Sequence, residues 1–223
     1  MQLAPLFTYL ANLAQHNNRE WFLANKTTYD QLRAQFETDV AWLAQELLKL
    51  DPALGTLEPR RCMFRINRDV RFSRNKDPYK TNFSAYFTTN GDKKGNGPGY
   101  YLQLGPGGQT LIAGGLYEPE KTQLAAIRQE IDYNADALHQ VLWMPAFQKY
   151  FAGLNGEQLK RIPTGYPTDH PEGNLLRFKS FVTSHNVADA QALALPDFRN
   201  YALDGFRWLL PLCRFLREAV SGI

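Results

Sequence analysis

The spacing of apolar residues changes twice along this chain, and that change constrains the fold more than any other feature. From residue 3 to residue 50, apolar side chains recur every three or four positions, which is the period of an α-helix. Between residues 61 and 114 they alternate with polar side chains, as in strands with one buried face. From residue 119 onward the helical period returns. The pattern predicts an α+β protein.

Polar residues and prolines divide the helical regions into separate helices. Asn17 and Glu20 have the spacing of a capping box, with Asn17 as the cap. Asp51 and Pro52 are expected to end the long helix that precedes them, and Pro211 is expected to kink or split the last helix. Apart from the segment after Asn17, the helical period predicts helices over residues 3–15, 29–50, 119–131, 136–143, 172–178 and 197–220.

The alternating region predicts strands joined mostly by short turns. We expect strands over residues 62–66, 82–87, 100–104 and 110–114, with a further short strand at 181–182. A glycine-rich tip at 90–99 and the turn at 105–108 favour an antiparallel meander. The expected fold is therefore an antiparallel sheet of about four to six strands, packed against a long N-terminal helix and several C-terminal helices. No repeat or long linker is visible, so residues 1–223 are expected to form a single domain.

Composition indicates a soluble protein of the cytoplasm. Apolar residues make up 44% of the chain and aromatic residues 13%, enough for a sizeable core. There is no run of about eighteen apolar residues and no signal-peptide pattern at the start. Cys62 and Cys213 lie far apart and are expected to be reduced, buried thiols.

Positive charge is concentrated in one segment. Between Arg60 and Lys80 there are six arginines and two lysines against two aspartates, although the net charge of the whole chain is only +3. Side chains of like charge this close together repel one another unless an anion is present, and the arginine fork suits phosphate or carboxylate. We therefore predict an anion-binding site here, which could be catalytic. The expected ligand-binding residues are Arg65, Arg68, Arg71, Ser73, Lys76, Tyr79, Lys80, Gly114 and Gly115.

Asp69 is the one candidate for a catalytic role in this segment. It could orient the neighbouring Arg68, or act as a general base if its pKa were raised. Gly114 and Gly115 follow a predicted strand and would let a ligand or another backbone come close.

The stretch from Arg65 to Thr81, which reads RINRDVRFSRNKDPYKT, resembles the family called domain of unknown function 2461. The resemblance extends over nearly the whole chain, through NREWF at 18–22, YYL at 100–102, GGLY at 114–117 and DHP at 169–171. It implies a mixed α/β fold of one domain. It implies no activity and no catalytic residue.

Two other interpretations of the basic segment stay open. Its arginines could pair with Asp69, Asp77 or glutamates of the long helix and only stabilise an irregular loop. Alternatively, the segment could form an interaction surface for a protein or a nucleic acid, extended by Lys93 and Lys94. The near-neutral net charge argues against general affinity for nucleic acid.

Other sites known from short motifs are not predicted. The chain has no Walker loop, nucleophile elbow or dinucleotide-binding glycine pattern, so no cofactor is expected. The four histidines, His16, His139, His170 and His185, lack the spacing of a zinc site, so no metal is expected. Trp21, Phe22 and Tyr29 are expected to pack between helices rather than to stack on bases.

Overall fold

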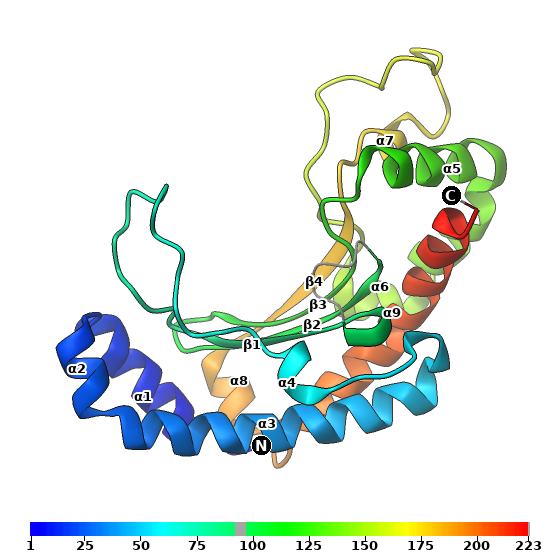
Figure 1. Ribbon diagram of the computed structural model, residues 1–223. Helices are drawn as coiled ribbons and strands as arrows, with labels where there is room; N and C mark the ends of the chain where they lie inside the picture. Colours follow the sequence, from blue (N-terminus) through cyan, green and yellow to red (C-terminus); the bar gives the residue numbers. More distant parts are fainter. Residues whose placement is uncertain (92–96, 223) are drawn as a thin grey trace. The chain divides into compact units, whose positions relative to one another are not determined.

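The computed structural model describes residues 1–91 and 97–222, which form helices and a four-stranded antiparallel sheet (Figure 1). The strands lie in the order β1-β2-β3-β4, the order of the chain. Their bounds are Phe83–Phe87 for β1, Gly99–Leu104 for β2, Thr110–Leu116 for β3 and Phe181–Val187 for β4. The predicted α+β fold with a β-meander is confirmed. Lys93 and Lys94, at the predicted glycine-rich tip, lie outside the described residues.

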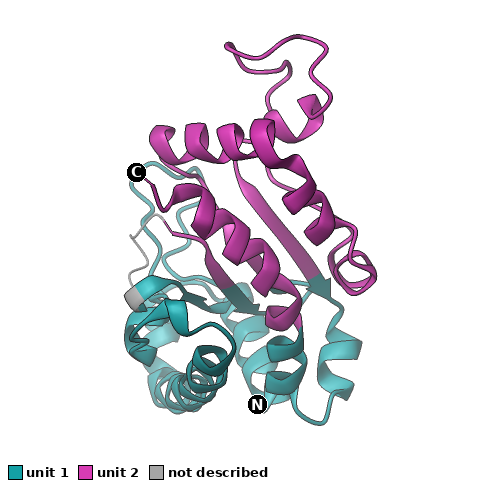
Figure 2. Ribbon diagram, turned by 90° about the vertical axis from the view of Figure 1, so that its right-hand side faces the viewer, with its two compact units in different colours: residues 1–93, 101–112, 186–204 teal, residues 94–100, 113–185, 205–223 magenta. Residues whose placement is uncertain are grey.

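The chain divides into two compact units, each assembled from separate segments (Figure 2). The first unit comprises Met1–Lys93, Tyr101–Ile112 and Asn186–Asp204, and the second comprises Lys94–Tyr100, Ala113–His185 and Gly205–Ile223. Strands β2, β3 and β4 each have residues in both units. That residues 1–223 form one domain stays a prediction.

The long helix of the first unit packs against strand β1. Tyr29 and Phe36 of this helix, α3, contact Phe83 of β1 with ring centroids 5.8 Å and 5.5 Å apart. Leu43 and Leu47 continue the same apolar stripe and are fully buried. The helices that lie wholly in this unit are α1 (Leu3–Gln15), α2 (Arg19–Ala24), α3 (Lys26–Leu50), η1 (Pro52–Leu54), α4 (Pro59–Cys62), η2 (Thr89–Gly91) and α8 (Asp189–Ala194).

In the second unit, two predicted helices are parts of one element. Helix α5 runs through both predicted ranges and is interrupted only at Asn134, whose backbone is not helical. The other helices of this unit are α6 (Pro145–Phe151) and α7 (Gly173–Leu176), while α5 itself spans Lys121–Leu142. Helix α9 (Phe198–Val220) begins in the first unit and continues through Pro211 as a single helix.

The predicted helix cap is wrong by one residue. Asn18, not Asn17, caps α2, because its side chain accepts a hydrogen bond from the Trp21 amide at 2.9 Å. The Asn17 side chain instead pairs with the backbone of Tyr79: its amide donates to the Tyr79 carbonyl at 3.0 Å and its oxygen accepts from the Tyr79 amide at 3.1 Å.

The predicted strand at 62–66 is also wrong. Pro59 starts a turn of helix, α4, that includes Cys62, and only isolated bridges follow, at Met63 with Ala85 and at Asn67 with Tyr79. Met63 is buried while Phe64 is half-buried, so the alternation that suggested a strand does not describe the packing.

Several predictions about individual side chains are confirmed. Cys62 and Cys213 are buried free thiols. Phe22 and Tyr29 are buried and pack against each other with ring centroids 5.0 Å apart. Across residues 1–91 and 97–222, no helix is both long enough and apolar enough to cross a membrane.

Arg199 links the start of α9 to α3 within the first unit. Its guanidinium donates to both oxygens of Asp197, with Nε–Oδ1 at 3.0 Å and Nη2–Oδ2 at 2.9 Å. Its Nη1 lies 3.6 Å from Oδ1 of Asp39, a buried residue of α3. The hydrogen bond with Arg199 lowers the pKa of Asp197 to about 2, whereas burial raises the pKa of Asp39.

Asp197→Asn is expected to lower the free energy of unfolding by about 1 kcal/mol at pH 7, because solvent screens part of this interaction. The folded-state pKa of Asp197 lies below its unfolded value, so the contribution is complete above about pH 4 and is lost as the pH falls towards 2. In urea titrations, the wild type and the variant should differ in free energy of unfolding at pH 3 by about half as much as they differ at pH 7. A difference that does not shrink at pH 3 contradicts this role.

Gly115 allows strands β3 and β4 to come together within the second unit. Its φ is +114°, and a Cβ added there would overlap the Phe181 carbonyl oxygen.

Gly115→Ala is expected to lower the free energy of unfolding by roughly 3 kcal/mol or more, since strain and overlap add. Gly165→Ala is the matched control: φ is +101° there and nothing lies within 4 Å, so only the strain of roughly 1 to 2 kcal/mol is expected. Equal losses in urea titrations of both variants would contradict the overlap.

Candidate functional site

The basic loop, residues 65–80, is held at its base by backbone pairing. The Arg68 amide donates to the Pro78 carbonyl at 2.9 Å, and the Lys80 amide donates to the Ile66 carbonyl at 2.8 Å. Between these pairs the chain makes a long excursion without helix or strand, the cyan to teal segment that follows α4 in Figure 1. The two ends of the loop are therefore fixed, and its tip is exposed.

Tyr79 anchors the loop to the N-terminal helices. Its ring is buried and stacks on Phe22 of α2, with centroids 4.1 Å apart, while Asn17 pairs with its backbone. Lys80, the next residue, points to the other side and places its Nζ 5.0 Å from the Phe64 ring centroid. The Phe64 ring in turn packs edge-on against Tyr101 of β2, at 6.2 Å.

Arg68 braces the loop through neutral groups. Its guanidinium donates to the Asp77 carbonyl oxygen at 3.1 Å and lies 3.4 Å from the Ser73 hydroxyl oxygen. Neither acceptor carries a charge, so the positive charge of Arg68 is not neutralised by these contacts. Lys76 is placed in the same way, with its ammonium donating to the Val70 carbonyl at 3.0 Å.

Asp69 pairs with Arg71 rather than with Arg68. The Arg71 guanidinium donates to both carboxylate oxygens, Nε–Oδ1 at 3.0 Å and Nη2–Oδ2 at 2.7 Å. This hydrogen bonding lowers the pKa of Asp69, and Arg65 lowers it further through its charge. The raised pKa that a general base would need is therefore not found at Asp69.

The remaining cations of the loop are open to solvent. Arg65 and Arg74 are exposed, and neither makes a hydrogen bond or ion pair with any described residue. Phe72, between Arg71 and Ser73, is 96% exposed at the tip. The loop thus carries several positive charges without an acidic partner in the described part of the chain, and one exposed aromatic ring.

Gly114 and Gly115 belong to the second unit, whereas the basic loop belongs to the first. A Cβ at Gly114 would lie 2.8 Å from Cδ1 of Leu209 in α9 and 2.9 Å from the Gly99 carbonyl oxygen of β2. At both glycines it is therefore the protein's own strands and helix that come close. Their inclusion among the ligand-binding residues stays a prediction.

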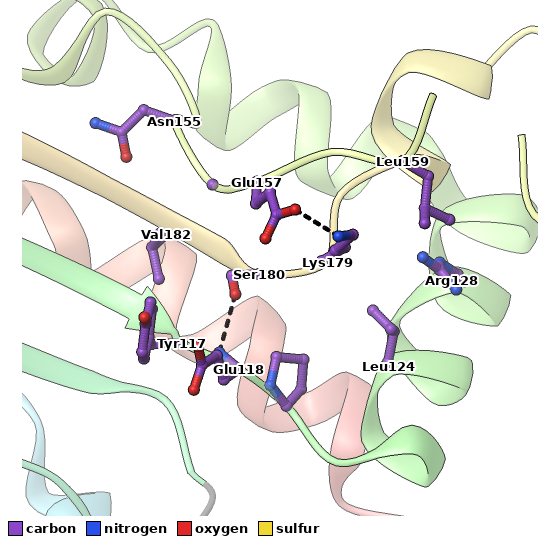
Figure 3. Close-up of a pocket in the computed structure, with 12 residues that line it drawn as sticks. Tyr117, Glu118, Leu124, Arg128, Asn155, Glu157, Leu159, Lys179, Ser180 and Val182 are labelled. Atoms are coloured by element: carbon purple, nitrogen blue, oxygen red, sulfur yellow. Dashed lines mark hydrogen bonds and ion pairs between the residues drawn. The ribbon is translucent and has the colours of Figure 1, made fainter. Parts of the chain in front are cut away.

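The second unit contains a cavity of about 570 Å³ that sequence patterns did not indicate (Figure 3). Its walls come from the end of β3, the first turns of α5, an extended segment at 155–159 and the start of β4. The lining residues are Tyr117, Glu118, Pro119, Leu124, Arg128, Asn155, Gly156, Glu157, Leu159, Lys179, Ser180 and Val182.

Arg128 is the cation of this cavity that has only neutral partners. Its Nε donates to the Leu176 carbonyl at 2.9 Å and its Nη2 donates to the Phe178 carbonyl at 3.1 Å. Burial lowers the pKa of this half-buried guanidinium. The other cation, Lys179, is paired with Glu157 across the cavity wall, as Figure 3 shows.

The only cavity residue in the stretches that carry the family resemblance is Tyr117. The GGLY stretch at 114–117 ends at Tyr117, and Arg128 follows shortly after, yet neither has a spacing typical of a known site. Within the described part of the chain, no group of three or more histidine, cysteine, aspartate or glutamate side chains could hold a metal ion.

Comparison of the chain with curated proteins and with solved structures gives no match. One family model matches residues 5–215, which include the basic loop and every residue of the cavity. The chain therefore belongs to the family described as conserved hypothetical protein (DUF2461).

Proposed function

We propose that the basic loop binds a small ligand that carries phosphate or carboxylate groups. The observation that carries this proposal is the pairing of Arg68 with neutral oxygens of Asp77 and Ser73. These contacts fix the guanidinium in place without neutralising it. A preorganised cation of this kind loses little side-chain entropy when an anion binds.

The neighbouring charges favour the same class of ligand. Arg65 and Arg74 have no hydrogen bond or ion pair among the described residues, and Lys76 contacts a carbonyl oxygen. An anion bound among them would relieve their mutual repulsion. Internal neutralisation would require a carboxylate partner for Arg65 and for Arg68, and the described residues provide neither with an ion pair.

Asp69 has a positioning role in this proposal. Both of its oxygens accept hydrogen bonds from Arg71, and its pKa is lowered by that contact, so it is a poor proton acceptor at neutral pH. The proposal is accordingly one of binding, and no catalytic step is assigned.

Phosphate, pyrophosphate and citrate, each added at constant ionic strength, are expected to raise Tm. A ligand at about 100 times its Kd stabilises by about 2.7 kcal/mol, or roughly 5 to 10 °C for a chain of this length. Arg65→Gln should lower the Tm of the free protein only slightly, because Arg65 makes no hydrogen bond or ion pair with a described residue and acts on Asp69 only through its charge. The same variant should weaken binding by about tenfold. Calorimetric titration with pyrophosphate measures the change in affinity.

Lys149→Gln is the matched control, since it removes the same charge from an exposed position on α6 in the second unit. It should bind pyrophosphate as the wild type does. If both variants bind equally weakly, the effect is one of net charge and the proposed site is wrong. Failure of all three anions to bind would also refute the proposal.

Phe72 favours a second candidate function, the binding of single-stranded nucleic acid. The ring is almost fully exposed, and the Arg71 Cζ lies 5.8 Å from its centroid. Exposed aromatic rings beside arginines are typical surfaces on which bases stack.

Phe72→Ala is expected to weaken binding of a labelled single-stranded oligonucleotide by about 1 to 3 kcal/mol and to leave pyrophosphate binding unchanged. Fluorescence anisotropy at two salt concentrations measures the affinity, which should fall steeply as salt rises. Tyr133→Ala is the control, because Tyr133 is also an exposed aromatic residue, 91% exposed on α5. The absence of binding at low salt would eliminate this candidate.

A further inference from the structure

The walls of the cavity in the second unit are built by close backbone packing. The Asn155 amide donates to the Val182 carbonyl at 2.9 Å, and the Lys179 amide donates to the Glu157 carbonyl at 2.7 Å. Between these bonds, a Cβ added at Gly156 would overlap the Ser180 carbonyl oxygen. The segment 155–159 is therefore held against the start of β4, and the side chains that it directs to the cavity are well positioned.

Arg128 provides a site for a negative group. It is half-buried on the second turn of α5, and its two hydrogen-bond partners are backbone carbonyl oxygens. A partly desolvated guanidinium without a carboxylate partner gains most from an anionic ligand. Nη1 makes neither of these two hydrogen bonds.

Glu118 provides the opposite charge. Its φ of +46° is uncommon for a residue other than glycine, and its amide donates to the Ser180 hydroxyl oxygen at 2.9 Å. The Glu118 carboxylate is close enough to Tyr117 to raise the pKa of that hydroxyl. Glu118 thus lies just after the end of β3, with its backbone fixed to Ser180, whereas Arg128 lies on α5 (Figure 3).

The rest of the lining is neutral in sum. Glu157 and Lys179 form an ion pair with each other, and Pro119, Leu124, Leu159 and Val182 contribute apolar surface. A cavity of about 570 Å³ is within the size range of small-molecule sites, which combine apolar walls with a few placed polar groups.

We infer that this cavity binds a small zwitterion with an apolar body, whose carboxylate contacts Arg128 and whose ammonium group contacts Glu118. A short apolar peptide is a molecule of this class. The inference is separate from the anion site of the basic loop, because it uses other residues and a ligand with no net charge.

Calorimetric titration with the dipeptide L-alanyl-L-leucine tests the inference on the wild-type chain. The dipeptide should bind with one-to-one stoichiometry. Its N-acetyl derivative, which lacks the ammonium group, and its C-terminal amide, which lacks the carboxylate, should each bind roughly tenfold more weakly or worse. No binding of the dipeptide at millimolar concentration, or equal binding of all three, would overturn the inference.

Glu118→Gln locates the ammonium contact. This variant keeps the shape of the side chain. It should bind the free dipeptide only as weakly as the wild type binds the N-acetyl derivative, and its affinity for the N-acetyl derivative should equal that of the wild type. Asp136→Asn is the control, since it removes a negative charge from an exposed position on the same unit and should change neither affinity. If Glu118→Gln leaves dipeptide binding unchanged, the assigned contact is wrong. If the variant does not fold, the affinities of the wild type for the N-acetyl and amide derivatives decide instead.

Discussion

The pairing of Tyr79 with Asn17 and Phe22 is the contact on which the basic loop depends. A loop with several like charges would not hold one conformation by its own contacts, since repulsion opposes every compact arrangement. Burial of the Tyr79 ring and the two hydrogen bonds to its backbone supply the missing constraint at the base. Apolar packing against the N-terminal helices therefore adds to the backbone pairs and the Arg68 contacts that order this loop, and it uses none of the cations at the tip.

Two arginines in different units share one arrangement. Arg68 and Arg128 both donate to backbone carbonyl oxygens, and neither is held by a carboxylate. Carbonyl oxygens fix the orientation of a guanidinium but leave its charge in place. Arg71 and Lys179, by contrast, are each paired with an acidic side chain nearby. Arg68 and Arg128, which lack an acidic partner among the described residues, are accordingly the cations on which the two proposed binding sites rest.

Helices of this chain could be predicted because one face of each is buried. The apolar spacing located the bounds of α1 and the end of α3 at Asp51, since these helices bury a continuous stripe. The strand predicted at 62–66 is wrong because Pro59 starts a helical turn that extends to Cys62. The partners of Arg68 and the cavity around Arg128 could not be predicted, because backbone carbonyls have no sequence signature and the cavity residues come from four separate segments.

The way in which the chain crosses between its two units limits how it can be divided. Each unit contains three separate stretches of sequence, and four of the five boundaries between them fall inside β2, β3, β4 and α9. No single cut of the polypeptide therefore yields either unit with all of its segments. A cut at any of these four boundaries also divides a strand or helix α9. To obtain either unit on its own, its three stretches of sequence would have to be joined by new connections.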